Sequence, residues 1–204
     1  MDYSSRLYGA VIWILGVSFV LFAVRAGATT ATPVSGPHDA TSHRRFDDVA
    51  HWVSVFDDPA RDAWQKPAEV VHTLRLRPGM VVADIGAGTG YFTKTLAAAV
   101  GVQGTVFAVE VEPNLVTHLR SRAETEGLRN VTPVLASNDT PRLPRGSVDL
   151  VLFADTYHHI DDRLQYMRHV QQLLAPAGRV VVIDWYLSLI PHLTLPTNGC
   201  VEGS

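Results

Sequence analysis

Three glycines at alternate positions follow an acidic residue near the middle of this 204-residue chain. Asp84 lies close to the end of an apolar run, and Gly86, Gly88 and Gly90 come directly after that run. Glycine lets a backbone turn sharply and lets a ligand approach the main chain with no Cβ in the way. These residues therefore predict a tight turn from a strand into a helix, with room for a ligand against its backbone.

The spacing of the glycines restricts which nucleotide such a turn suits. The dinucleotide fingerprint G-x-G-x-x-G needs a third glycine where Tyr91 stands, since Gly90 comes one residue too early. A phosphate-binding P-loop needs Lys and Ser or Thr after its last glycine, and neither follows here. The pattern disfavours a pyrophosphate or triphosphate ligand, although an ordinary structural turn also uses glycine in this way.

The segments that position this turn alternate between strands and helices. Five apolar runs predict strands, at residues 80–85, 105–109, 131–135, 148–153 and 179–184. Three segments predict helices, at residues 91–100, 113–126 and 161–174, and a lead-in helix pair is expected within 46–76. Aliphatic strands separated by helices indicate a Rossmann-like α/β fold with a parallel sheet covered on both faces. Ligands bind at the carboxyl ends of such strands.

The motif VVADIGAGTGYFT, which begins at Val81, resembles the first motif of the class I S-adenosylmethionine-dependent methyltransferases. The resemblance covers about residues 46–185 and includes the strand ending at Glu110 and the segment 155–159. It implies S-adenosylmethionine as the cofactor and methyl transfer as the activity. Residues 155–159 differ from the Asn/Asp-Pro-Pro-Tyr/Phe pattern that resembles methylation of exocyclic amino groups, so the small-molecule branch is the expected one.

The resemblance also implies the cofactor site. The glycine turn would lie under the methionine part with Asp84 ordering it, and Glu110 would accept hydrogen bonds from the two ribose hydroxyls. Asn138 or Asp139 would read the adenine amino group, although turn formation before Pro141 explains both residues equally well. The expected cofactor-binding residues are Asp84, Gly86, Ala87, Gly88, Gly90, Glu110, Val111, Asn138, Asp139 and Asp155.

The lead-in segment offers two further candidates. In related enzymes this segment closes over the cofactor, so Trp64 and Gln65 either line the site or belong to a helix cap with a core tryptophan.

His158 is the candidate catalytic residue. Methyl transfer from a sulfonium is an in-line displacement that needs alignment, and it needs a base only when the acceptor loses a proton. Imidazole titrates near neutrality, and His158 follows the fourth strand, although His158 and His159 could instead cap the next helix. No metal site is expected, because the two histidines lack neighbouring ligands in the sequence and Cys200 is the single cysteine.

Charge and composition indicate which classes of binding partner to expect. A net charge of -3 with interspersed signs offers no field that would attract a polyanion, so a small-molecule acceptor is expected and nucleic acid is not. Two other functions stay open at this point. One is an adenosylmethionine-binding module that transfers nothing, and the other is an NAD-type oxidoreductase that uses the same turn.

The two ends of the chain differ from the middle. Arg6, the apolar run 9–24 and the small residues 26–28 predict that residues 1–28 form a signal peptide, with an uncleaved membrane anchor through residues 7–24 as the alternative. The protein is then exported or anchored. Residues 29–45 have linker composition, residues 46–186 form the methyltransferase-like domain, and residues 187–204 are expected to be a non-native or disordered tail that truncates the fold after its fifth strand.

Overall fold

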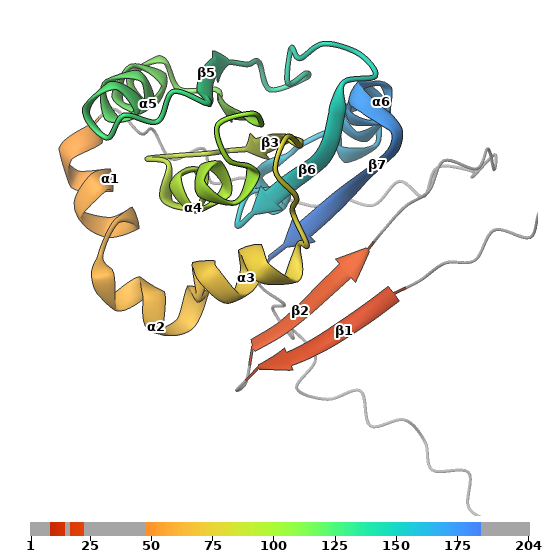
Figure 1. Ribbon diagram of the computed structural model, residues 1–204, viewed down its shortest axis with the longest axis horizontal. Coiled ribbons are helices and arrows are strands. Elements are labelled where there is room, and N and C mark those ends of the chain that lie inside the picture. The colour runs from red at the N-terminus through yellow and green to blue at the C-terminus, as the bar shows by residue number, and fades with distance from the viewer. Residues whose placement is uncertain (1–8, 15–16, 23–47, 185–204) are drawn as a thin grey trace, which may run out of the picture.

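The computed structural model describes residues 9–14, 17–22 and 48–184 (Figure 1). A two-stranded antiparallel sheet near the N-terminus consists of β1 (Gly9–Ile14) and β2 (Val17–Phe22). The lead-in segment forms α1 (Val49–Phe56), η1 (Pro59–Arg61), α2 (Asp62–Gln65) and α3 (Pro67–Thr73). The rest forms β3 (Val81–Ile85), α4 (Tyr91–Val100), β4 (Thr105–Glu110), α5 (Pro113–Thr125), β5 (Val131–Leu135), β6 (Val148–Ala154), η2 (Tyr157–His159), α6 (Arg163–Leu173) and β7 (Leu174–Ile183).

The larger sheet has five parallel strands in the order β5-β4-β3-β6-β7. The chain starts the sheet at the central strand β3, runs outward to β5 and then crosses back to β6 on the other side of β3. The strand order therefore reverses beside β3, and ligands of open α/β sheets bind at such a point. This architecture confirms the predicted Rossmann-like α/β fold.

The core lies on both faces of this sheet. On one face, Val82 and Val106 pack with α3 and α4 through Leu74 and Leu96, while α5 packs its Leu119 against Ala108 of β4. On the opposite face, residues of β3 and β6 pack against α6 through Tyr166, Val170 and Leu173. Because side chains alternate along a strand, Asp84 faces the α4 side and Ile85 faces the α6 side.

Local signals fix the helix ends near the site. Gly101 ends α4 with φ 65, and its N–H donates to the carbonyl of Ala97. Pro113 begins α5, where its missing N–H costs nothing. The Asp162 carboxylate accepts a hydrogen bond from the Gln165 N–H and so begins α6.

Two elements differ from the sequence prediction. The last strand starts at Leu174, not at residue 179, because Leu174 pairs with Val148 before a register shift that leaves residues 175–178 out of the ladder. Pro176 lies in that interruption, where its lack of an N–H is tolerated. The lead-in segment forms four short helical elements instead of a pair, with Lys66 in the left-handed region at φ 46 separating α2 from α3.

Of the predicted leader, the structure describes only the residues of β1 and β2, while residues 1–8, 15–16 and 23–28 lie outside the described part, as do the predicted linker 29–45 and tail 187–204. Among the described residues no helix is both long and apolar enough to cross a membrane.

Candidate functional site

The glycine turn connects β3 to α4 and brings three segments together. Gly86 has φ +71, and a Cβ at this position would lie 2.3 Å from the Cγ2 of Thr156, in the loop that follows β6. Gly88 has φ +58, and its missing Cβ faces the ring of Phe56 in α1 at 3.7 Å. A side chain at Gly86 would separate the two loops at the switch point, so glycine is required there by contact as well as by conformation.

Glu110 ends β4 and holds the turn from the neighbouring strand. Its side chain is 7% exposed. Its Oε2 accepts a hydrogen bond from the Gly88 N–H at 2.8 Å, and its Oε1 accepts from the N–H groups of Val111 at 2.7 Å and Glu112 at 3.2 Å. Burial raises the pKa of Glu110, and the three N–H donors oppose that rise. The carboxylate retains one ordinary acceptor position, on Oε2.

Asp84 lies beneath the turn on the α4 side of the sheet. It is 2% exposed, and its Oδ2 accepts a hydrogen bond from the Thr93 hydroxyl at 2.6 Å. Burial raises the pKa of Asp84 to about 6, the Thr93 bond lowers it, and the nearby Glu110 carboxylate raises it further. Two buried carboxylates thus lie under one backbone turn, an arrangement that favours a cationic ligand.

A cavity of about 500 Å³ opens at the carboxyl ends of the strands, a size that suits a small molecule. Its polar lining comes mainly from the ends of β4, β5 and β6, and its apolar lining includes residues of α1, β3, β4 and α5. The lining includes Trp52, Phe56, Gly86, Gly88, Glu110, Val111, Asn138, Asp155, His158, His159, Ile160 and Tyr166. A smaller adjoining hollow of about 70 Å³ shares Gly86, Gly88 and Asp155 and adds Asp84, Ala87 and Arg61.

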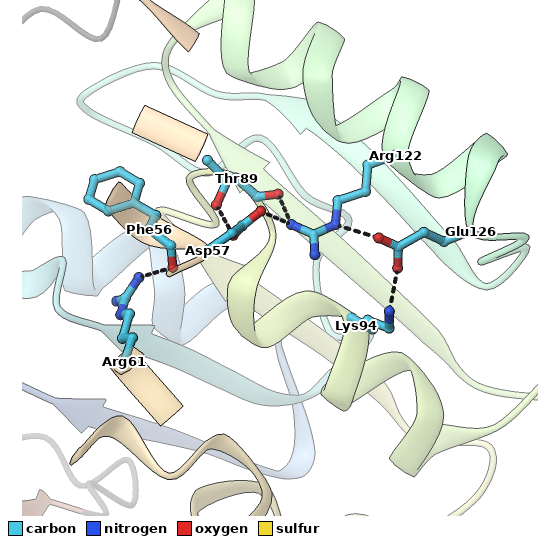
Figure 2. Close-up of polar contacts among 7 residues, drawn as sticks. All are labelled: Phe56, Asp57, Arg61, Thr89, Lys94, Arg122 and Glu126. Carbon is cyan, nitrogen blue, oxygen red and sulfur yellow. Dashed lines mark hydrogen bonds and ion pairs between the residues drawn. The ribbon is translucent and has the colours of Figure 1, made fainter. Parts of the chain in front are cut away.

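The segment that follows α1 is fastened to the glycine turn and to α5 (Figure 2). The Asp57 carboxylate accepts hydrogen bonds from the Thr89 hydroxyl at 2.7 Å and from Nη1 of Arg122 at 2.7 Å. Arg122 also donates to the carbonyl of Thr89 and forms an ion pair with Glu126, which pairs in turn with Lys94. These contacts place α1 over the turn, where its aromatic residues form one wall of the cavity.

Arg61 extends the same anchoring on the other side of α1. Its Nη1 donates to the carbonyl of Phe56 at 2.9 Å, and its guanidinium lies 4.3 Å from the ring centroid of Tyr91 (Figure 2 shows the first contact). The Tyr91 hydroxyl donates to the Asp62 carboxylate at 2.5 Å. Burial lowers the pKa of Arg61 from its ordinary value, and the surrounding acids oppose that shift. A cation therefore lies beside the turn in the smaller hollow.

His158 lies in η2, lines the large cavity, and contacts Asp184, the residue that follows β7. Its backbone N–H donates to Oδ2 of Asp184 at 3.1 Å, and its ring Nδ1 lies 2.7 Å from Oδ1 of the same carboxylate. Arg163 of α6 donates to the carbonyl of His158 at 3.0 Å. The hydrogen bond to Asp184 raises the pKa of His158, and burial opposes that rise.

Comparison with known proteins gives the family. A family model described as a methyltransferase domain matches residues 82–178. A ubiquinone/menaquinone biosynthesis C-methyltransferase, UbiE, from Hydrogenovibrio crunogenus is 26% identical over 145 residues, which are 69% of this chain and 56% of the relative. The crystal structure of an S-adenosylmethionine-dependent methyltransferase from Aquifex aeolicus superposes with a TM-score of 0.64 at 28% identity, covering 68% of this chain and 73% of that one. Together these similarities support the class I S-adenosylmethionine-dependent methyltransferase superfamily for the described domain.

The superfamily likeness extends to other small-molecule enzymes. The aklanonic acid methyltransferase DauC from Streptomyces sp. strain C5 is 30% identical over 102 residues, which are 50% of this chain and 46% of that protein. The chain thus spans about half the length of the curated relatives it matches.

The structure brings most of the residues that the superfamily resemblance assigned to the cofactor into one place. The large cavity is lined by Gly86, Gly88, Glu110, Val111, Asn138 and Asp155, together with His158. Asp84 and Ala87 line the smaller hollow.

Two of the assigned residues line neither space. Gly90 begins α4 at φ 94 and donates its N–H to the carbonyl of Ala87 at 2.8 Å. Asp139 lies in a turn, and its carbonyl oxygen lies 3.0 Å from Nδ1 of His169.

Some residues at the site were missed by sequence reasoning. The aromatic wall comes from Trp52 and Phe56, whereas Trp64 and Gln65 line neither space. Trp64 is 41% exposed and so does not belong to the core, while Gln65 is the buried member of the pair at 5%. The alternation of polar and apolar residues in 46–76 does not indicate which aromatic residues line the cavity, because tertiary contacts position these short helices.

Asp184 was also missed, although a signal for it existed. It is the last residue of the predicted strand 179–184, as Glu110 is the last residue of β4, and parallel strands place such acids at one edge. The expectation that the histidines lack neighbouring ligands was wrong, because ligand atoms of Asp155, His158 and Asp184 lie within 4.8 Å of one another. The 2.7 Å contact already pairs His158 with Asp184 by a hydrogen bond, so this group needs no ion to hold it together.

Proposed function

We propose that this domain binds S-adenosylmethionine at the glycine turn and transfers its methyl group to a small-molecule acceptor in the same cavity. The observation that carries the proposal is the buried Glu110 carboxylate, which holds the Gly88 N–H while lining the cavity. A structural turn alone does not need a second buried acid from another strand. Here Glu110 and Asp84 both lie under the turn, despite the raised pKa that burial gives each of them.

The residues present fit the cofactor. Gly86 and Gly88 keep side chains off the backbone at the switch point, so a ligand can approach the main chain closely. Oε2 of Glu110 has a free acceptor position for one ribose hydroxyl. A second hydroxyl would compete for Oε1 with the Glu112 N–H, whose hydrogen bond is the longest of the three at 3.2 Å. When bound, adenosylmethionine supplies an electrophilic methyl group on a sulfonium.

The residues of the chain would contribute to catalysis by aligning the cofactor and the acceptor. Asn138 lies in the cavity at the end of β5, where the adenine ring is expected, and Trp52 and Phe56 offer aromatic surface for the bound molecules. The acids at the turn stabilise the positive charge of the donor, and α1 excludes water from above the turn. Holding two reactants in line contributes a large share of the rate in such a displacement.

The names of the relatives support a small-molecule acceptor. UbiE acts in ubiquinone and menaquinone biosynthesis and DauC on aklanonic acid, and Ile160 and Tyr166 in the cavity lining offer hydrophobic surface to such a small molecule. An inactive adenosylmethionine-binding module is the second candidate, because the contacts of the glycine turn and of Glu110 concern binding of the cofactor and not transfer of its methyl group.

The test compares ligands by thermal shift and then measures transfer. Adenosylmethionine and adenosylhomocysteine should each raise the melting temperature, while NAD should not. Incubation with methyl-tritiated adenosylmethionine and reduced naphthoquinones should label the organic phase. Stabilisation by adenosylhomocysteine without label in any fraction would favour the inactive module, and stabilisation by NAD alone would exclude the proposal.

The location of the protein is a separate proposal. Arg6, the apolar run 9–24 and the small residues 26–28 support export or membrane anchoring. Fractionation of cells that express the full chain, with N-terminal sequencing of the product, should find it outside the cytoplasm or in the membrane fraction. A cytoplasmic product that retains Met1 would refute this proposal.

A further inference from the structure

The carboxylate of Asp184 holds His158 by two separate contacts. Oδ2 accepts from the His158 backbone N–H at 3.1 Å and Oδ1 lies 2.7 Å from Nδ1 of the ring. An ionised carboxylate only accepts hydrogen bonds, so Nδ1 must carry the proton of this contact. One side chain thus fixes both the position of η2 and the tautomer of the histidine, which leaves Nε2 as the nitrogen with a free lone pair whenever the ring is neutral.

The backbone around this pair is held from a different element. Arg163 of α6 donates to the carbonyl of His158 at 3.0 Å and to the carbonyl of Tyr157 at 3.3 Å. The turn that carries His158 is therefore fixed between the end of β7 and the start of α6. A histidine that merely capped α6 would not need this arrangement, since Asp162 already caps that helix.

The charges that face His158 set its titration. Asp184 and Asp155 raise its pKa from two strand ends, while burial and Arg163 lower it. The ring of His159 lies 3.9 Å away, centroid to centroid, and lines the same cavity. The balance favours a more basic imidazole than one in water, as in the histidine–carboxylate pairs that serve as general bases.

From this geometry we infer that His158 is the general base of the reaction, that Asp184 is its positioning residue, and that the acceptor is a hydroxyl compound or carbon acid that loses a proton on methylation. The inference rests on the proposed function. As the acceptor oxygen or carbon forms its bond to the methyl carbon, the carbon–sulfur bond breaks and its electrons stay on sulfur. The proton of the acceptor passes to Nε2 of His158 and from there to solvent. Acceptors that keep all their protons, such as tertiary amines and heteroaromatic nitrogens, would gain nothing from this pair.

The first measurement needs no acceptor. NMR titration of the histidine side chains in the full chain, saturated with adenosylhomocysteine, should show His158 with a pKa above the ordinary value of a histidine side chain. Asp184→Asn should lower the pKa of His158, and Asp184→Glu should restore part of the shift. Equal titration of His158 in wild type and Asp184→Asn would overturn the pairing. A chain that does not bind adenosylhomocysteine would instead refute the proposed function, and the titration of the free chain would still test the pair.

The second measurement uses two probes, 1,4-dihydroxynaphthalene kept reduced and quinoline, which has no proton to lose at its nitrogen. Transfer to 1,4-dihydroxynaphthalene should rise with pH through the pKa measured for His158. His158→Gln should lower kcat by about 100-fold or more with little change in KM. Asp184→Asn should lower both kcat and the pH midpoint, and His72→Gln should match wild type.

Three results would overturn the base role. One is transfer to quinoline in preference to 1,4-dihydroxynaphthalene. Another is a pH profile that is unchanged in His158→Gln and Asp184→Asn. The third is no transfer to either probe by a chain that binds adenosylmethionine.

Discussion

Replacing Glu110 by Gln tests whether this buried acid holds the glycine turn. The carboxylate accepts three backbone hydrogen bonds, from the N–H groups of Gly88, Val111 and Glu112. An amide has one oxygen and an NH₂ group, so it can serve only one side of this arrangement and leaves one or two N–H donors without an acceptor. Hydrogen bonds to charged groups contribute about 1.5–3 kcal/mol each, and a buried unsatisfied donor costs about 1–3 kcal/mol.

The net magnitude is smaller than this sum, because burial raises the pKa of Glu110 and a neutral amide avoids that penalty. We expect Glu110→Gln to lower the free energy of unfolding by about 2 kcal/mol, or the melting temperature by roughly 4–8 °C. Urea and thermal unfolding measure the change. The matched control is Glu112→Gln, which alters the acid two residues further along the chain and should change the free energy of unfolding by less than about 0.5 kcal/mol. Equal stability of the two variants would refute the reasoning.

Three further predictions address the turn and its surroundings. Gly86→Ala should lower the melting temperature far more than Gly79→Ala. Both glycines have positive φ, but of the two only Gly86 would bring an added Cβ within 4 Å of other atoms. Equal decreases in melting temperature would contradict the importance of this contact. Asp84, with a pKa raised from 3.8 to about 6, binds more protons in the folded state, so the free energy of unfolding should fall by about 2 kcal/mol as pH rises from about 4 to 6. Asp84→Asn should reduce that slope and leave the part that the raised pKa of Glu110 contributes, and an unchanged slope would exclude this assignment. Arg122→Gln should weaken adenosylhomocysteine binding and lower the free energy of unfolding in urea by about 1–2 kcal/mol. Lys94→Gln removes an exposed ion pair and should change the free energy of unfolding by less than about 0.5 kcal/mol. Equal changes in the two variants would refute a role for the Arg122 contacts.

The fold was predictable because each strand carries its own signal. The aliphatic runs of β3, β4 and β6 are buried on both faces, so hydrophobicity alone marks them, and the glycines mark where β3 ends. The start of β7 was not predictable, because Leu174 pairs with Val148 across a register shift that only the neighbouring strand imposes. Turn residues 175–178 with Pro176 and Gly178 gave the opposite local signal.

The site was predictable where its residues lie directly at strand ends. Gly86, Gly88, Glu110 and Asp155 follow from the rule that carboxyl ends of parallel strands converge. Asp57, Arg61 and Phe56 did not follow, since their positions depend on contacts between segments 30 or more residues apart, such as Arg61 with Tyr91 (91 − 61 = 30) and Asp57 with Thr89. No local sequence pattern predicts such contacts. They determine that Trp52 and Phe56, and not Trp64, lie at the cavity.

Calorimetric titration of the full chain with adenosylhomocysteine tests the central claim most directly. We predict saturable binding of one molecule per chain, abolished by Gly88→Val, which would place a branched side chain at φ +58 against Phe56 and against any ligand on the turn. Gly127→Val, also at positive φ but with nothing within 4 Å, should bind as wild type does if it folds. No heat of binding with a folded wild-type chain, or undiminished binding by Gly88→Val, would contradict the account.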